Sequence, residues 1–168
     1  MENEIIGQTL SVIAMALMFI SYQVKDQKNL LIIQSIGTGF TAISFLFLNA
    51  MSAFLLNIVC IIRNVIFYFQ NDKSKYSRTI AVVLAIVMCS VGALSWQGYH
   101  SLLIIIALAL NTFFMSYGDP QLLRKSIPFT STLTMTHNII VLSIGGICSE
   151  FFSILSSIIG IIRYRKKQ

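Results

Sequence analysis

The chain has 168 residues, of which 56% are hydrophobic and 11% are charged, and its mean hydropathy is +0.80. Because soluble proteins contain about 25% charged residues, this composition excludes an ordinary soluble domain and indicates that lipid surrounds the chain. The net charge of +6 is therefore interpreted as charge asymmetry across a bilayer, and no nucleic-acid partner is expected. The length suits one compact membrane domain.

Seven apolar runs are predicted to be membrane-spanning helices, since a helix needs roughly 17–25 mostly apolar residues to cross a bilayer. In chain order the runs are residues 5–22, 30–48, 52–69, 78–96, 101–117, 127–144 and 149–163. The sixth run is rich in Ser and Thr, whose hydroxyls are tolerated in lipid because they hydrogen-bond to their own helix. The acidic residues 1–4 lack the basic segment of a signal peptide, so the first run is expected to be retained.

Eleven of the twelve basic residues fall in alternate loops or at the C-terminus, so an odd number of crossings places them all on one side. They are Lys25, Lys28, Lys73, Lys75, Arg78, Arg124, Lys125, Arg163, Arg165, Lys166 and Lys167. The other side is expected to carry Glu2, Glu4 and Glu150 at its edge, which leaves no acidic residue within the membrane. The positive-inside rule then predicts a bacterial inner-membrane protein with its N-terminus outside and its C-terminus in the cytoplasm.

The two ends of the chain share short sequence patterns. Residues 19–23 read Phe-Ile-Ser-Tyr-Gln, residues 114–117 read Phe-Met-Ser-Tyr, and Ile-Ile-Arg occurs at both 61–63 and 161–163. Two three-helix units need one linker helix between them to keep the same orientation. We therefore expect an all-α membrane protein in a 3+1+3 parallel repeat: a first triple-helix bundle at 1–70, a linker with helix four at 71–98, and a second triple-helix bundle at 99–168.

This plan resembles the SWEET, PQ-loop and MtN3-like superfamily. Pro120-Gln121 looks like a PQ-loop motif, whereas the first half has Tyr22-Gln23 at the corresponding place. The chain length, the Leu-Ile-Ile-Gln at 31–34 and Arg63-Asn64 most resemble the YgjV-type bacterial inner-membrane proteins. The superfamily resemblance implies movement of small solutes such as sugars, vitamins or amino acids. The related PnuC vitamin transporters use tryptophan-rich motifs, and a single Trp96 argues against their substrate class.

Arg63 is the one basic residue within a predicted span, roughly 10 Å from its cytoplasmic end at 1.5 Å per residue. Its long side chain could extend to the headgroups, or its guanidinium could hold a carboxylate, a phosphate or another polar solute inside the bundle. Its countercharge is expected from a loop aspartate, a backbone carbonyl or an anionic solute. The loop candidates are Asp26, Asp72 and Asp119, and an inner gate closed by Asp119 or Asp26 is the preferred expectation.

Further polar residues mark the second, third and sixth spans. Asn57 and Asn64 share one face of the third span, where they could line a pocket or bond to another helix. The second span carries a polar stripe of Gln34, Ser35, Thr38, Thr41 and Ser44, and the sixth carries Thr130, Thr134, His137 and Asn138, with Pro128 near its start. His137 could be a core histidine, a proton carrier or a substrate ligand.

The expected function is a transporter or facilitator that moves a small polar solute by alternating access. The predicted substrate-binding residues are Asn57, Arg63, Asn64, His137 and Asn138, and the predicted gating residues are Gln23, Asp119, Pro120, Gln121 and Pro128. A receptor, a scaffold or a subunit of a complex with the same fold is the alternative. No catalytic motif or glycine-rich phosphate loop is present, and the three cysteines lack a metal-site or disulfide pattern, so no enzyme, metal or cofactor is expected. The oligomeric state stays open, with a homo-oligomer one option.

Overall fold

The computed structural model of the protein describes residues 2–48, 50–70, 76–94, 96 and 98–165. These residues form seven helices and no strand, as the sequence predicts. The helices are α1 (Glu2–Ser21), α2 (Gln27–Phe47), α3 (Met51–Phe69), α4 (Tyr76–Leu94), α5 (Ser101–Met115), α6 (Pro120–Ile140) and α7 (Ile144–Arg163).

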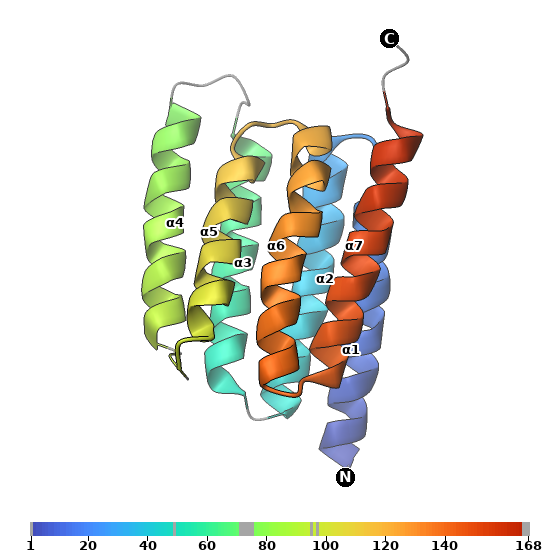
Figure 1. Ribbon diagram of the computed structural model, residues 1–168, viewed down its shortest axis with the longest axis vertical. Coiled ribbons are helices and arrows are strands. Elements are labelled where there is room, and N and C mark those ends of the chain that lie inside the picture. The colour runs from blue at the N-terminus through green and yellow to red at the C-terminus, as the bar shows by residue number, and fades with distance from the viewer. Residues whose placement is uncertain (1, 49, 71–75, 95, 97, 166–168) are drawn as a thin grey trace.

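The helices stand in two rows (Figure 1). One row holds α4, α5, α6 and α7, and the other holds α3, α2 and α1. Each helix packs against the next along the chain, and α7 packs back against α1. The start of α1 and the end of α7 lie at opposite ends of the bundle, as an odd number of helices requires.

The described basic residues gather at one end of the bundle, apart from Arg63. This end contains the α1–α2 turn, the α5–α6 turn, the start of α4 and the end of α7, and we call it the basic end. The residues found there are Lys25, Lys28, Arg78, Arg124, Lys125, Arg163 and Arg165. Lys73, Lys75, Lys166 and Lys167 lie outside the described residues. The predicted clustering of basic residues on one side is thus confirmed as a clustering at one end of the bundle, for the part of the chain that the structure describes.

Five helices agree with the predicted runs to within three residues, whereas α6 and α7 begin earlier. Helix α6 starts at Pro120 because Asp119 caps it, its side chain accepting a bond from the Gln121 amide at 2.8 Å, and because proline suits the first turn. The expected loop at 118–125 is therefore mostly helix, and Pro128 lies in the helix interior. Helix α7 starts at Ile144, which places Glu150 within a helix rather than at an outer edge.

The bundle is polar inside and apolar outside. Among the described residues, 18 buried residues are polar or charged and 13 are hydrophobic. Large hydrophobic side chains are exposed on all seven helices, including Ile5, Ile32, Leu55, Val82, Ile106, Phe129 and Ile158. A soluble protein shows the opposite distribution. Hydrocarbon is the solvent that suits this outer surface.

Among the residues that the structure describes, three helical segments are long and apolar enough to cross a membrane: Glu4–Ser21, Gln27–Phe47 and Ile144–Arg163. The segments Ala53–Phe69, Arg78–Leu94 and Ser101–Met115 are apolar but shorter. Helix α6 is the polar one, and its hydroxyls bond to its own backbone as expected: Thr130, Thr132, Thr134 and Thr136 each donate to the carbonyl four residues earlier.

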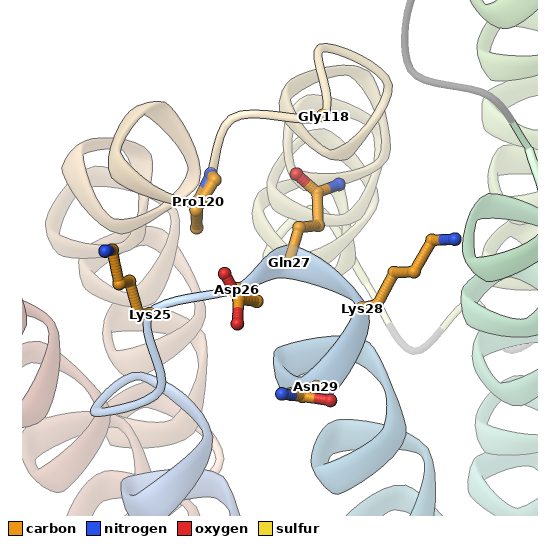
Figure 2. Close-up of a pocket in the computed structure, with 7 residues that line it drawn as sticks. All are labelled: Lys25, Asp26, Gln27, Lys28, Asn29, Gly118 and Pro120. Atoms are coloured by element: carbon orange, nitrogen blue, oxygen red, sulfur yellow. The ribbon is translucent and has the colours of Figure 1, made fainter.

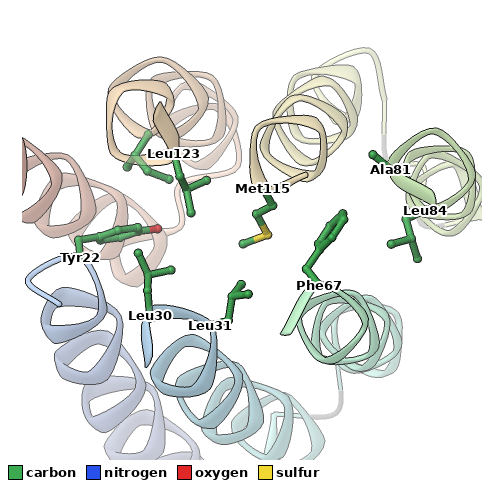
Figure 3. Close-up of a cluster of buried hydrophobic side chains, with 9 residues drawn as sticks. Tyr22, Leu30, Leu31, Phe67, Ala81, Leu84, Met115 and Leu123 are labelled. Carbon is green, nitrogen blue, oxygen red and sulfur yellow. The ribbon is translucent and has the colours of Figure 1, made fainter. Parts of the chain in front are cut away.

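The hydrophobic core lies near the basic end (Figure 3). Side chains from five helices and from the residue that follows α1 meet there, namely Tyr22, Leu30, Leu31, Phe67, Ala81, Leu84, Met115, Leu123 and Ile127. This cluster holds the two rows together beside the polar residues described next.

Candidate functional site

Arg63 is buried in the bundle and points toward α5. Its side chain is 4% exposed. Its Nη1 donates to Thr112 Oγ1 at 3.2 Å, and its Nε and Nη2 donate to Asn64 Oδ1 at 3.2 and 3.0 Å. The guanidinium therefore does not extend to the headgroups. Beside Thr112, the buried Oδ1 of Asn111 has no hydrogen-bond partner.

The aspartates expected to close a gate on Arg63 do not contact it. Asp119 caps α6, and Asp26 lies at the start of α2, where its side chain makes no capping bond. Asp72 lies outside the described residues. Within the described part of the chain, Arg63 bonds to Asn64 and Thr112 rather than to Asp119 or Asp26, so a gate closed by either aspartate stays a prediction. A buried guanidinium without a carboxylate suits an anionic group that comes from elsewhere.

Glu150, which the sequence led us to expect at the outer edge, lies instead inside a helix. It lies within α7, and its carboxyl group interacts with Ser131 of α6. The buried Tyr22 lies within electrostatic reach of Glu150 and Arg63, and next to the side chain of Gln34. The interior thus brings one acidic and one basic residue into the neighbourhood of the same tyrosine. The sequence did contain a signal for this position. The seventh predicted run, residues 149–163, is only 15 residues long, and extending it at its start to the length of a full crossing places Glu150 inside the span.

The five predicted substrate-binding residues do not form one site. Arg63 and Asn64 lie together toward the basic end. Asn57 Nδ2 donates to the carbonyl of Ala53 in its own helix at 2.8 Å. His137 and Asn138 lie in the last turn of α6, at the opposite end of the bundle.

His137 packs against His100, the other histidine of the chain. The two Nδ1 atoms of His100 and His137 are 3.1 Å apart, and the ring centroids are 4.8 Å apart. His137 is 7% exposed. The sequence showed no signal for this pair, because His100 precedes α5 and lies 37 residues away. Among the described residues, no group of three or more His, Cys, Asp or Glu could hold a metal ion.

Two predicted gating residues, Gln23 and Gln121, belong to one network at the basic end. Gln23 Nε2 donates to the carbonyl and Oγ of Ser156 at 2.7 and 2.9 Å. Gln121 Nε2 donates to the carbonyl of Tyr164 at 2.6 Å, and the Tyr164 hydroxyl donates to the carbonyl of Gln23 at 2.8 Å. These bonds join the α1–α2 turn to the start of α6 and the end of α7.

Arg124 completes this network, and we call Gln23, Gln121, Arg124, Ser156 and Tyr164 the latch. Arg124 is fully buried. Its Nε donates to the carbonyl of Tyr22 at 2.8 Å, its Nη2 donates to the carbonyl of Val24, and its Nη1 donates to Gln121 Oε1 at 3.2 Å. Its guanidinium also lies 4.8 Å from the centre of the Tyr164 ring. Arg124 was expected in a loop, but it lies within α6, because this helix begins at Pro120.

A cavity of about 520 Å³ lies beside the latch, at the start of α2 (Figure 2). Its lining residues come from the α1–α2 turn, the first turn of α2 and the α5–α6 turn: Lys25, Asp26, Gln27, Lys28, Asn29, Gly118 and Pro120. Gln27 Nε2 donates to the carbonyl of Met115 at 2.8 Å, while the buried Gln27 Oε1 has no partner.

A helical bundle with a polar interior and an apolar exterior defines an integral membrane protein. The comparison with known families agrees: the chain belongs to the Imp-YgjV family of bacterial inner membrane proteins, whose model matches residues 5–168. This match confirms the resemblance to the YgjV-type proteins, whereas the link to the SWEET and PQ-loop superfamily stays a prediction. No curated protein matches the chain, and no solved structure does.

Proposed function

We propose that the protein transports or facilitates the passage of a small polar solute across the bacterial inner membrane. The observation that carries the proposal is Arg63, a buried cation that bonds to Asn64 and Thr112 but to no carboxylate among the described residues. Buried charges are expensive within a bilayer and usually have a functional reason. Here an anionic group of the solute would supply the missing countercharge.

The proposed path runs between the two rows of helices. In this proposal the chain crosses the membrane seven times with its basic end in the cytoplasm, and α1–α3 and α5–α7 are the two units that rock. Their places in separate rows support this division, with α4 beside α5 at the edge. Gln34, Ser131 and Glu150 add polar groups to the interior between the rows.

The latch supports a state closed at the basic end. It links the first unit, through the α1–α2 turn, to α6 and α7 of the second. Opening toward the cytoplasm would require these bonds to break. Gln23, Gln121, Asp119 and Pro120 would act there, with Pro128 as a hinge inside α6.

A transport assay tests this function. The purified protein is reconstituted in liposomes and offered labelled carboxylates, phosphate esters, sugars and amino acids. We expect uptake of one anionic or zwitterionic class, lost in Arg63→Gln and retained in Arg163→Gln, which removes the same charge at an exposed position. Folded protein that moves none of these solutes would contradict the proposal.

A receptor or scaffold without transport is the second candidate. The asymmetry of the two halves favours it, since Tyr22-Gln23 stands where the second half has Pro120-Gln121. In addition, Leu155-Ser156-Ser157 stands where the first half has Asn57, and both serines are fully buried. Ligand binding without flux in the same liposomes would identify this class. Neither function involves catalysis or a cofactor in our proposal, and both allow a homo-oligomer.

A further inference from the structure

The cavity at the start of α2 carries an inference that does not depend on the transport proposal. We infer that it binds a phosphate ester that also carries a free hydroxyl group. Such a ligand is either the glycerol-phosphate headgroup of a lipid or a soluble glycerol phosphate, and the two share the chemistry that the cavity recognises.

Gln27 provides the first argument. Its side chain is 8% exposed and lines the cavity, rising from α2 toward Gly118 in Figure 2. Because Nε2 donates to the carbonyl of Met115, the amide orientation is settled, and Oε1 is the atom left without a partner. A buried amide oxygen needs a hydrogen-bond donor. A hydroxyl group is the donor that an anionic ligand can bring.

The charges around the cavity provide the second argument. Lys25 and Lys28 are exposed and outnumber the single carboxylate of Asp26. Asp26 is the N-cap residue of α2 but makes no side-chain capping bond. The first backbone amides of α2 therefore lack a side-chain acceptor, and a helix N-terminus favours an anion such as phosphate. The carboxylate of Asp26 is free to accept a second hydroxyl.

The two lysines have different surroundings, which makes Lys25 the better phosphate ligand. In Figure 2, Lys25 lies on the same side of the cavity as Pro120, whereas Lys28 extends away on the other side. The Lys28 Nζ lies 5.8 Å from the centre of the Tyr68 ring. Lys25 directly follows Val24, whose carbonyl accepts a bond from Arg124 of the latch. A ligand held by Lys25 and by the α5–α6 turn would therefore strengthen the latch.

Gly118 shapes the wall opposite Gln27. Its φ is +68°, a backbone conformation that side chains rarely adopt. This turn brings Gly118 and Pro120 over the first turn of α2. The cavity thus lies between the two turns at which the predicted halves correspond.

Thermal unfolding of the purified full-length protein in neutral detergent tests the inference. The probes are glycerol 3-phosphate, inorganic phosphate, and micelles doped with phosphatidylglycerol or phosphatidylcholine. We expect glycerol 3-phosphate or phosphatidylglycerol to raise the Tm, and the effective source to identify the ligand as soluble or lipid. Inorganic phosphate should bind about tenfold more weakly, since it lacks the alcohol hydroxyl that would reach Gln27 while the phosphate is held at the start of α2.

Two variants and a matched control make the test specific. Lys25→Ala should weaken binding about tenfold, as expected for one charge-assisted bond. Lys125→Ala, which removes an exposed lysine of the basic end outside the cavity, should change it less than about twofold. Gln27→Leu should erase the preference over inorganic phosphate. Equal losses in Lys25→Ala and Lys125→Ala, or no stabilisation by any probe, would overturn the site.

Discussion

Gly160 of α7 lies directly against Arg124 of α6. A Cβ atom at position 160 would lie 2.9 Å from Arg124 Cδ and 2.5 Å from the carbonyl oxygen of Tyr22. The absence of a side chain at Gly160 therefore creates the space in which the guanidinium reaches the α1–α2 turn. This close approach joins three parts of the chain: the end of α1, the start of α6 and the end of α7.

We expect Gly160→Ala to destabilise the protein by about 1–3 kcal/mol, the usual cost of overpacking a filled site. Either the Tyr22 carbonyl or the Arg124 side chain must move to admit the methyl group. Unfolding in detergent measures the loss. Gly39→Ala is the matched control, since it also lies inside a helix but has open space at its Cβ; it should be neutral or slightly stabilising. Equal effects at both positions would contradict the close contact.

Arg124 and Lys125 are adjacent, and replacing either one by Gln removes one positive charge, so the stability of the two variants can be compared directly. Arg124→Gln removes bonds to the carbonyls of Tyr22 and Val24, and hydrogen bonds to a charged group contribute about 1.5–3 kcal/mol each. We expect a loss of about 2 kcal/mol or more and faster proteolysis at the α1–α2 turn. Lys125→Gln, at an exposed position, should change stability by less than about 0.5 kcal/mol. An unaltered cleavage rate in Arg124→Gln would refute the latch.

Thr112 is the residue through which α5 reaches Arg63. Thr112→Val removes the acceptor of Nη1 and should cost about 0.6 kcal/mol, up to about 1.7, as measured for hydrogen bonds between membrane helices. Thr132→Val provides the comparison, because Thr132 is exposed and bonds only to Pro128 of its own helix. A double-mutant cycle with Arg63→Gln isolates the pair. A coupling energy near zero would show that the two side chains do not interact.

The proposed orientation predicts which positions a membrane-impermeant maleimide reaches in whole cells. In a background in which Ser replaces Cys60, Cys89 and Cys148, Tyr99→Cys should react from outside, since Tyr99 is 88% exposed at the end opposite the basic end. Lys25→Cys should react only after the cells are permeabilised. The reverse pattern would invert the topology, and reaction of both in intact cells would argue against the three crossings that are proposed between positions 25 and 99.

Patterns local in the chain predicted the helices well. Long apolar runs predicted seven helices, because a segment in lipid must satisfy its own backbone bonds. The early start of α6 was also readable, since Asp119-Pro120 is a helix-start pattern. The apolar criterion missed it because the following residues are polar. The Glu150 error has the same cause, since a charged residue was taken to end a span.

The sequence alone could not predict which polar side chains lie together in the folded bundle. Arg63 and Arg124 are both arginines near the basic ends of their helices, yet one bonds to an amide and a hydroxyl and the other to backbone carbonyls. His137 was predicted to share a site with Arg63, but it contacts His100 instead. Such partners depend on the rotation and neighbours of each helix, which no local pattern records.

The sequence by itself determined that this chain is a helical membrane protein with its described positive charges at one end, because composition and charge spacing respond directly to the bilayer. Only the tertiary structure decided that Arg63 has no carboxylate partner among the described residues, that Arg124 joins three segments, and that a cavity with an unpartnered amide oxygen opens at the start of α2. The reason is physical. Whether a residue suits the lipid depends on that residue and its depth in the membrane, which the local sequence records. Hydrogen-bond partners instead depend on how the helices pack, and they can lie up to 141 residues apart in the chain.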